Sequence, residues 1–267
     1  EVSELEINDV LKSFLGKSMQ KPPMVSAIKK DGKKLYEYAR SGKSVEIPER
    51  EIEIYGLELL NINQEEIKEI LEKHRHWLKR DCDNWEDMRA DLHNTDLSYT
   101  NLSYNNLSYA NLRNADLSNA DLNNINLSNA NLSNANLNNV NLSYADLRDV
   151  DFNDANLSNV NLHCANLHHA NLRYANLSDA NLRFTDLRYT DLHYANLYNA
   201  DLHNADLRGA DLRNADLLYA NLCYANLHNV DLRDANLCYV NLYNADFSNV
   251  ILGNTDLRYS YRNGDEC

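Results

Sequence analysis

The most regular feature of the chain is an apolar residue at every fifth position from Leu92 to Leu257. This residue recurs 34 times without an insertion, and it is leucine everywhere except at Phe152 and Phe247. The residue before it is Asp or Asn in every unit but one, where Ile251 stands, and the residue two before it is small, most often Ala. The pattern therefore indicates a repeat protein over most of the chain.

A period of five restricts the path that the backbone can take. In extended backbone, residues two apart point to the same side, so Ala110 and Leu112 face one way while Asn111 faces the other. An odd period cannot keep one apolar face on a flat strand, so the chain must turn a corner within each unit. Four corners close a coil of about 20 residues, and stacking the coils buries each leucine at a gain of about 2 kcal/mol. We expect Asn and Asp to bind local backbone at the corners.

The repeat unit also resembles a known family. Residues 115–119 read Ala-Asp-Leu-Ser-Asn and residues 130–134 read Ala-Asn-Leu-Ser-Asn, and both are similar to the A-(D/N)-L-x-x consensus of the pentapeptide-repeat family. This resemblance implies the family's right-handed quadrilateral β-helix. We therefore expect an all-β fold, a right-handed quadrilateral β-helix, with a small α/β N-terminal region and a capping helix.

Composition changes sharply before the repeats, because every lysine, and every glutamate except Glu266, lies no later in the chain than Glu86. We expect a small α/β fragment over 1–62, a capping helix with its lead-in over 63–88, the solenoid over 89–260 and a C-terminal tail over 261–267.

Residues 63–80 have a helical pattern with Asn63 as the N-terminal capping residue. The apolar face of this helix must cover something, and the open edge of the first coil needs a cover. The apolar face consists of Ile67, Ile70, Leu71, Trp77 and Leu78. We expect the cap to be formed by Trp77, Leu78 and Trp85.

The region 1–62 carries different signals. A helical pattern runs from Ile7 to Leu15, and alternation at Ile52 and Ile54 indicates a strand. The runs 20–29 and 32–40 resemble an internal segment of bacterial tRNA pseudouridine synthase B. The residues that match the family motif are Lys29, Tyr36 and Arg40, and Val25 stands where the family usually has a Tyr that stacks on the flipped base. The family's catalytic aspartate motif lies upstream of this segment, so we expect a retained fragment without synthase activity.

Charge and cysteine content exclude several classes of function. A net charge of −14 argues against direct nucleic-acid binding, which needs basic stripes. The sequence has no apolar run of the length that a membrane span needs. Its five cysteines contain no C-x-x-C, and His163, Cys164 and His168 do not converge as zinc ligands would. We expect a cytoplasmic protein without a metal site, cofactor or catalytic residues.

Aspartates are concentrated in the later coils. Residues 89–258 contain 19 Asp and 10 Arg. Some members of the pentapeptide-repeat family bind DNA gyrase or topoisomerase by resembling duplex DNA, so the resemblance implies that an acidic face could bind such a partner. Duplex DNA, however, carries roughly two dozen charges over about 40 Å, well above this net charge. The candidate acidic face consists of Asp186, Asp191, Asp201, Asp206, Asp211, Asp216, Asp231 and Asp246.

Tyr219, Tyr239 and Tyr259 recur once in each predicted coil, so the stacking of coils places them in one column. Such a column could be a self-association seam or a stacking ladder that stabilises the solenoid. The last coil also presents an open edge, which favours a homodimer through the C-terminal coil.

These observations favour a non-catalytic solenoid scaffold for protein-protein interaction. One alternative is a DNA-mimicking binder or inhibitor of DNA gyrase or topoisomerase. The other alternative, a relic tRNA pseudouridine synthase, is disfavoured because the catalytic aspartate motif is absent.

Overall fold

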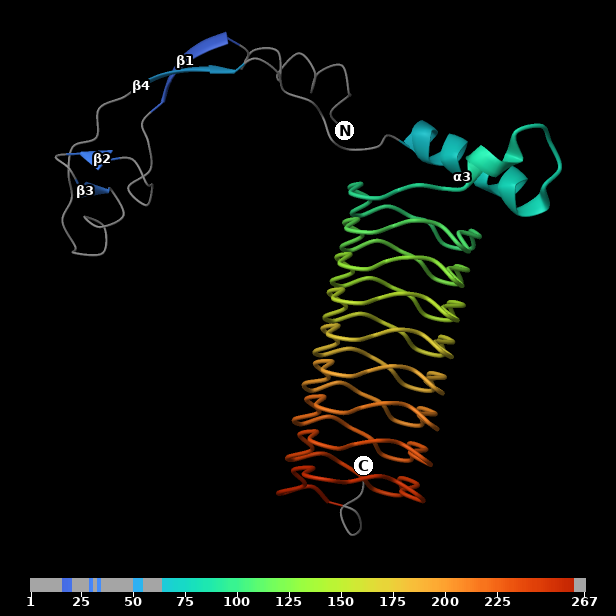
Figure 1. Ribbon diagram of the computed structural model, residues 1–267, viewed down its shortest axis with the longest axis vertical. Coiled ribbons are helices and arrows are strands. Elements are labelled where there is room, and N and C mark those ends of the chain that lie inside the picture. The colour runs from blue at the N-terminus through green and yellow to red at the C-terminus, as the bar shows by residue number, and fades with distance from the viewer. Residues whose placement is uncertain (1–15, 21–28, 31–32, 35–49, 55–63, 262–267) are drawn as a thin grey trace. The chain divides into compact units, whose positions relative to one another are not determined.

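The computed structural model describes residues 16–20, 29–30, 33–34, 50–54 and 64–261 (Figure 1). The chain divides into two compact units, Glu1–Leu60 and Asn61–Cys267. In the first unit, β1 (Gly16–Gln20) pairs antiparallel with β4 (Arg50–Ile54), and β2 (Lys29–Lys30) pairs antiparallel with β3 (Lys33–Lys34). The strand predicted at Ile52 and Ile54 is thus confirmed. The helix predicted over 7–15 and the motif residues Val25, Tyr36 and Arg40 lie outside the described residues.

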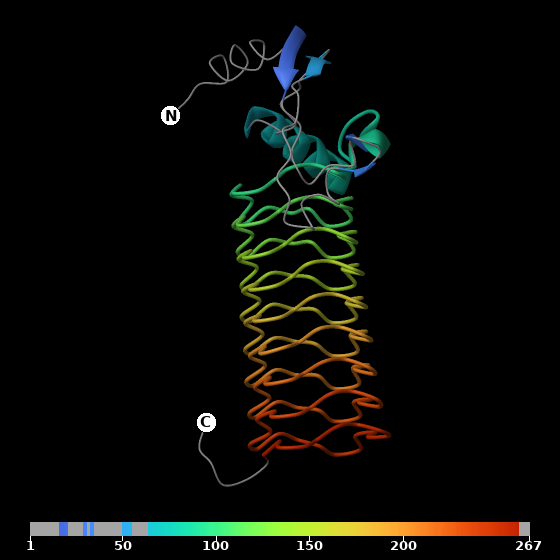
Figure 2. The same ribbon diagram turned by 90° about the vertical axis from the view of Figure 1, so that its left-hand side faces the viewer.

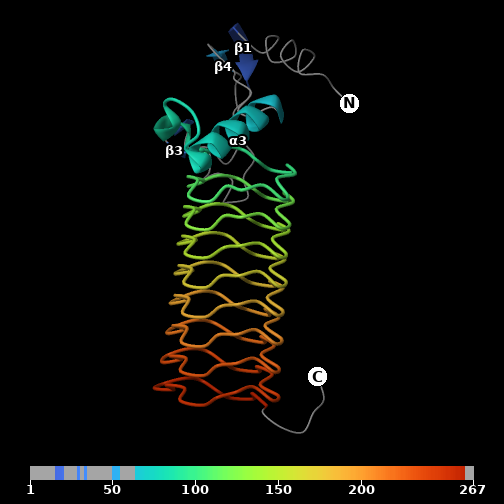
Figure 3. The same ribbon diagram turned by 90° about the vertical axis from the view of Figure 1, so that its right-hand side faces the viewer.

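The second unit contains a stack of equivalent coils. Parallel bridges join each residue that precedes a core position to its equivalent four repeats later, from Asp91 with Asn111 to Asn241 with Tyr261. Because a bridge begins at every fifth residue and closes after four repeats, each coil has four sides. Figures 2 and 3 show the stack from two further directions. The four-sided β-solenoid predicted from the period of five is confirmed.

Backbone hydrogen bonds between coils follow one repeated pattern. The amide of Leu92 donates to the carbonyl of Asn111 at 2.7 Å, and the amide of Asn111 donates back to the carbonyl of Ala90 at 3.0 Å. The amide of Asn94, two residues after the leucine, donates to the carbonyl of Arg113 at 2.9 Å. Each coil therefore satisfies the backbone of the next, and within the described residues only the first and last coils have no coil on their outer side.

Each corner is a tight turn. The amide of Ala110 donates to the carbonyl of Leu107 at 3.0 Å, and Tyr109, the third residue of this turn, has a φ of 64°. A left-handed third residue is typical of a type II turn and favours Gly or Asn. Among the described repeats that have a positive φ at this position, the residue is Asn 14 times and Tyr 11 times. Tyrosine therefore recurs at a left-handed position that asparagine would occupy with less backbone strain.

The Asp or Asn before each leucine fixes the corner from outside. Its side-chain oxygen accepts a hydrogen bond from the amide two residues later, as Asp96 Oδ1 does from Ser98 at 2.9 Å. Many of the asparagines also bond to the equivalent residue of the preceding coil: Asn156 Nδ2 donates to Asn136 Oδ1 at 3.0 Å. The local backbone role expected for these residues is confirmed.

The core is a set of leucine columns with small residues beside them. From Leu92 to Leu242 the exposed fraction of every core leucine is 0 or 1%, and Phe152 fits the same column at 0%. At about 2 kcal/mol for each buried leucine, these columns dominate the stability of the stack. Burial weakens only in the last coil, where Leu252 and Leu257 are partly exposed.

The helix α3 (Gln64–Lys79) covers the first coil, and the short helix η1 (Trp85–Met88) connects it to the repeats. Ile67 is buried, and Ile70 and Leu71 pack against the leucine core. The helix predicted over 63–80 is confirmed, although Asn63 lies outside the described residues. Within the part of the chain that the structure describes, no helix has the length and apolar character needed to cross a bilayer.

Candidate functional site

His74 connects α3 to the open edge of the first coil. Its side chain is completely buried, its Nδ1 accepts a hydrogen bond from the Ala90 amide at 3.0 Å, and its Nε2 donates to the Ser108 carbonyl at 3.0 Å. One coil later the equivalent carbonyl, of Ser128, accepts from the Tyr109 amide at 2.9 Å. The imidazole therefore supplies the bond that a preceding coil would have supplied.

This arrangement requires a neutral imidazole, with the proton on Nε2. Burial lowers the pKa of His74, and the nearby Arg89 charge lowers it further. The role of this residue was not predicted from the sequence, although His74 lies seven positions after Ile67, on the apolar face of the helix.

Of the predicted cap residues, Trp77 contacts His74. The Trp77 ring stacks on the imidazole with centroids 5.4 Å apart, and it tilts against Tyr109 at 5.9 Å. Leu78 is half-buried, and Trp85 lies in η1 with the Arg80 guanidinium 5.0 Å from its ring centroid.

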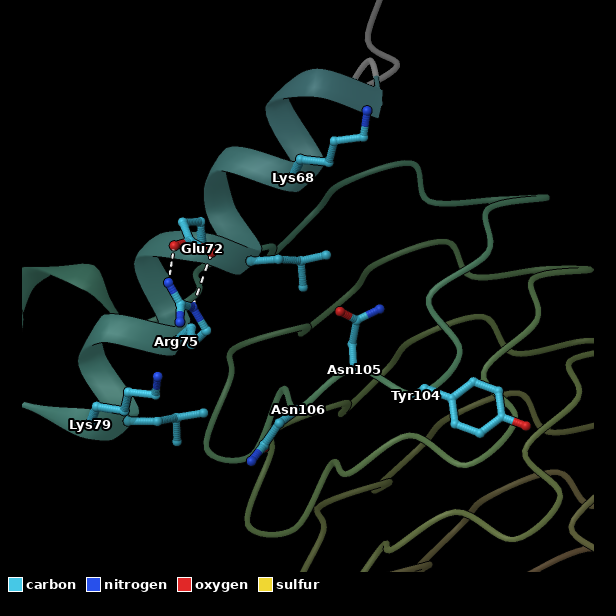
Figure 4. Close-up of a pocket in the computed structure, with 9 residues that line it drawn as sticks. Lys68, Glu72, Arg75, Lys79, Tyr104, Asn105 and Asn106 are labelled. Carbon is cyan, nitrogen blue, oxygen red and sulfur yellow. Dashed lines mark hydrogen bonds and ion pairs between the residues drawn. The ribbon is translucent and has the colours of Figure 1, made fainter.

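A cleft of about 580 Å³ lies between α3 and the first coils (Figure 4). The helix contributes Lys68, Glu72, Arg75 and Lys79 to the lining, and the coil contributes Tyr104, Asn105 and Asn106. Two of these cations are already paired, since Lys68 bonds to Glu65 at 2.6 Å and Arg75 bonds to Glu72. The full lining consists of Lys68, Leu71, Glu72, Arg75, Leu78, Lys79, Tyr104, Asn105 and Asn106. This lining contains no His, Cys, Ser or Asp, and its one carboxylate, that of Glu72, is bonded to Arg75.

The structure pairs six of the eight aspartates of the candidate acidic face with arginine. Asp231 illustrates the pattern, because the Arg233 guanidinium two residues later bonds to both of its carboxylate oxygens and lowers its pKa. The paired residues are Asp186 with Arg188, Asp191 with Arg173, Asp201 with Arg183, Asp206 with Arg208, Asp211 with Arg213, and Asp231 with Arg233. Asp216 accepts from Asn236 and Leu218, and Asp246 accepts from the Ser248 amide. Most of these carboxylates are therefore neutralised within the stack.

The three tyrosines of the predicted column stack on one another. The Tyr219 and Tyr239 centroids are 5.2 Å apart with an interplanar angle of 28°, and the Tyr239 and Tyr259 centroids are 4.8 Å apart at 14°. Tyr198 meets Tyr219 edge to face at 5.9 Å. All four rings are exposed, and their role in self-association stays a prediction.

A longer aromatic column, which we call the aromatic ladder, was missed from the sequence. Successive rings meet edge to face with centroids 5.7, 5.7, 6.1, 5.7 and 5.7 Å apart and interplanar angles of 83–90°. The ladder consists of Tyr144, His163, Phe184, His203, Tyr224 and Tyr243. In the sequence, consecutive residues of the ladder are separated alternately by one position less and one position more than a full coil. The reason is that the rings come alternately from the two outward positions of the same corner.

Two groups of potential metal ligands come together that the sequence did not suggest. They are His76 with Asp81 and Cys82, and Asp191 with His193 and Asp211, each with donor atoms within 4.8 Å of one another. In the second group both carboxylates are bonded to arginine, so a cation would have to displace Arg173 and Arg213. Cys164 Sγ contacts its neighbour His163 at 3.4 Å.

Comparison with known proteins gives different results for the N-terminal region, including most of α3, and for the coil stack. Residues 1–74 match the TruB family pseudouridylate synthase (N terminal domain). The tRNA pseudouridine synthase B of Oceanobacillus iheyensis is 52% identical over 68 residues, which cover 24% of this chain and 22% of that protein. The enzyme of the same name from Lactococcus lactis is 59% identical over 54 residues, which cover 20% of this chain and 16% of that protein. The chain therefore spans only about a fifth of these synthases.

The coil stack matches a different family. HetL from the cyanobacterium Nostoc sp. strain PCC 7120, a pentapeptide repeat protein involved in heterocyst differentiation regulation, is 33% identical, with 75% of this chain and 94% of that chain covered and a TM-score of 0.29. QnrB1, a plasmid-mediated fluoroquinolone resistance protein, is 18% identical, with 62% and 90% covered and a TM-score of 0.34. The family described as Pentapeptide repeats (8 copies) matches residues 88–124, 115–154, 125–163, 165–204, 175–214 and 215–254. These ranges span more than half of the chain and coincide with the coils, so the protein belongs to the pentapeptide-repeat family.

Proposed function

We propose that this protein is a non-catalytic scaffold that binds a protein partner through aromatic rings on the outside of its coil stack. The observation that carries the proposal is the number of large rings held in solvent on a rigid backbone. The rings whose exposed fraction is 40% or more are Tyr99, Tyr104, Tyr109, Tyr144, Tyr174, Phe184, Tyr189, Tyr194, Tyr198, Tyr219, Tyr224, Tyr239, Tyr259 and Tyr261.

Tyrosine suits a binding surface because it offers a large contact area and a polar tip with few rotatable bonds. In this stack the rings are also fixed before binding. Most of them project from the left-handed corner position, and many contact a ring in the next coil, such as Tyr174 with Tyr194 at 5.2 Å. A surface that is already ordered loses less entropy when a partner binds.

Two observations support a role without catalysis. The one carboxylate in the lining of the cleft beside α3, that of Glu72, is held by Arg75, and the match to pseudouridine synthases covers only a small part of those enzymes. We propose that residues 1–62 are a retained fragment, and we expect no tritium release when the protein is incubated with RNA that carries labelled uridine.

The DNA-mimicking alternative is less well supported by the charges. Mimicry needs unpaired negative charge along the stack, whereas six of the eight aspartates chosen for this face bond to arginine. We expect no inhibition of DNA gyrase supercoiling at micromolar protein. Inhibition at that concentration would restore this alternative.

The proposal also covers the two ends of the stack and its handedness. We propose that α3 acts as the N-terminal cap, that the coil winds right-handed as in the family, and that two copies associate through the last coil. The last proposal is supported by the partial exposure of Phe247, Leu252 and Leu257, whose counterparts in earlier coils are fully buried. Light scattering at several protein concentrations tests it, and a concentration-independent monomer mass would contradict it.

Capture from a cell extract tests the scaffold proposal. Immobilised protein is compared with a ring-depleted variant and with a control that carries changes at outward serines. The variant replaces Tyr144, Tyr174, Phe184, Tyr194, Tyr224 and Tyr239 by Asn, and the control replaces Ser118, Ser158 and Ser178 by Asn. We expect proteins that are retained by the parent and the control and lost by the variant. Equal retention by all three, or no specific retention, would contradict the proposal.

A further inference from the structure

The exposed rings of the aromatic ladder recur in every second coil. Tyr144, Phe184 and Tyr224 all lie at the left-handed corner position, and their exposed fractions are 56, 49 and 48%. Between them lie the half-buried rings of His163 and His203. The exposed rings are separated by two coils, and two coils at about 4.8 Å each give a spacing of about 9.6 Å. Three exposed rings therefore span about 19 Å along the stack.

This spacing selects among the shapes that a bound peptide can take. A polyproline II helix rises about 3.1 Å per residue with three residues per turn, so the same face recurs about every 9.3 Å. A β-strand presents the same face about every 6.8 Å, and an α-helical heptad repeats at about 10.5 Å. Summed over the two intervals between the three rings, the polyproline II repeat differs from the ring spacing by only about 0.6 Å, whereas the heptad repeat differs from it by about 1.8 Å.

The ladder is also nearly free of charge, unlike the corners that carry Arg188, Arg208 and Arg213. Between positions 143 and 244, the outward residues of this corner include one charged side chain, Arg183; its guanidinium is paired with Asp201 at 3.2 Å and lies 5.9 Å from the Phe184 ring centroid. A neutral aromatic surface suits a neutral, apolar ligand better than a charged one.

We propose that the aromatic ladder binds a proline-rich segment of a partner protein in the polyproline II conformation. Prolines at every third position lie against Tyr144, Phe184 and Tyr224 in turn. A polyproline II segment has no internal hydrogen bonds, so its carbonyl groups accept bonds from the hydroxyl groups of Tyr144 and Tyr224. This inference rests on the proposed scaffold function and adds the class of partner.

Peptide binding to the full chain tests the inference. The probe is a fluorescein-labelled decapeptide with proline at every third position and alanine elsewhere, and fluorescence polarisation measures its affinity. A second peptide has the same composition, with its prolines two and four positions apart. The ladder variant carries Y144N, F184N and Y224N, which suit the left-handed backbone because Asn is the commonest residue there. The matched control carries Y174N and Y194N, at the same position of a different corner and with similar exposure, 50 and 48%.

We expect saturable binding of the first peptide to the parent and to the control variant. The ladder variant and the second peptide should each weaken binding by about tenfold, which corresponds to about 1.4 kcal/mol. Equal binding of both peptides, or no difference between the ladder variant and the control, would overturn the inference. So would preferential binding of a soluble β-linked glucan, because aromatic rows also stack on sugar rings. If ring-dependent capture of proteins persists and the peptide does not compete, the inference fails while the scaffold proposal stands.

Discussion

Replacing His74 by alanine should release α3 from the first coil. The change removes the imidazole, which is the hydrogen-bond partner of two buried backbone groups, the Ala90 amide and the Ser108 carbonyl. A buried backbone group without a partner costs about 1–3 kcal/mol, so the loss for two groups is about 2–6 kcal/mol. The Trp77 ring also loses the imidazole on which it stacks at 5.4 Å. We therefore expect the free energy of α3 docking to fall by about 3 kcal/mol or more.

Acid should have the same effect as the substitution. The pKa of His74 is lowered by burial, so the unfolded or undocked helix binds a proton more readily than the docked one. The stabilisation by neutral His74 is therefore complete above the ordinary histidine pKa of about 6.5, and it declines as the pH falls from there toward the lowered pKa of the docked state. The limiting slope is about 1.4 kcal/mol per pH unit.

Hydrogen exchange of the α3 amides measures both effects, because it reports local opening without requiring the whole stack to unfold. The control is His76→Ala, two residues along the same helix, where the side chain is partly exposed and contacts Asp81 rather than the coil. We expect His74→Ala to reduce protection of α3 at neutral pH and to remove its dependence on pH near 6. Unchanged protection in this variant, or the same loss in the control, would refute the role assigned to His74.

Three further changes test the coil stack itself. Leu192→Ala should destabilise the protein by about 3 kcal/mol in chemical denaturation because it leaves a cavity. Leu252→Ala, in the partly exposed last coil, should have a smaller effect. Equal losses of stability in the two variants would contradict the difference in burial between these coils. Gly209→Ala should cost about 1 kcal/mol or more by the same method, since Gly209 has a φ of 69° and a Cβ there would lie 2.7 Å from the Tyr189 ring. Arg233→Gln should raise the pKa of Asp231 toward its usual value in an NMR titration; in the parent, stabilisation by this carboxylate is complete above pH about 4 and is lost as the pH falls through its lowered pKa. An Asp231 pKa that does not respond to this substitution would show that the ion pair is not formed in solution.

The fold was predictable because the information is repeated in every unit. In one unit, Leu112 and Ala110 indicate positions that face the core, and Asn111 indicates the corner. Because every unit repeats these indications, a departure in one unit, such as Ile251, does not obscure the pattern. The helix α3 was predictable for the same reason, from the spacing of Ile67, Ile70 and Leu71.

Single contacts between distant residues were not predictable in this way. A histidine on an apolar helix face is normally interpreted as half-exposed, and only the unpaired groups at the coil edge explain why His74 is buried. The aromatic ladder depends on side chains that reach across to the next coil, which moves the sequence spacing one position to either side of a full coil. The acidic face looked more negative in sequence than it is in space, although the recurring Asp-Leu-Arg triplet, as at Asp186 and Arg188, already placed each pair on the same side of the chain.

Engineered disulfide formation tests the register of the coils most directly. With the five native cysteines replaced by alanine, the pair Ser133→Cys and Asn153→Cys places thiols at equivalent positions of adjacent coils, while Ser133→Cys with Ser158→Cys places them on different corners. Adjacent strands are about 4.8 Å apart, within the range that a disulfide spans. We predict rapid oxidation of the first pair and none of the second. Failure of the first pair to cross-link, or equal cross-linking of both, would contradict the coil.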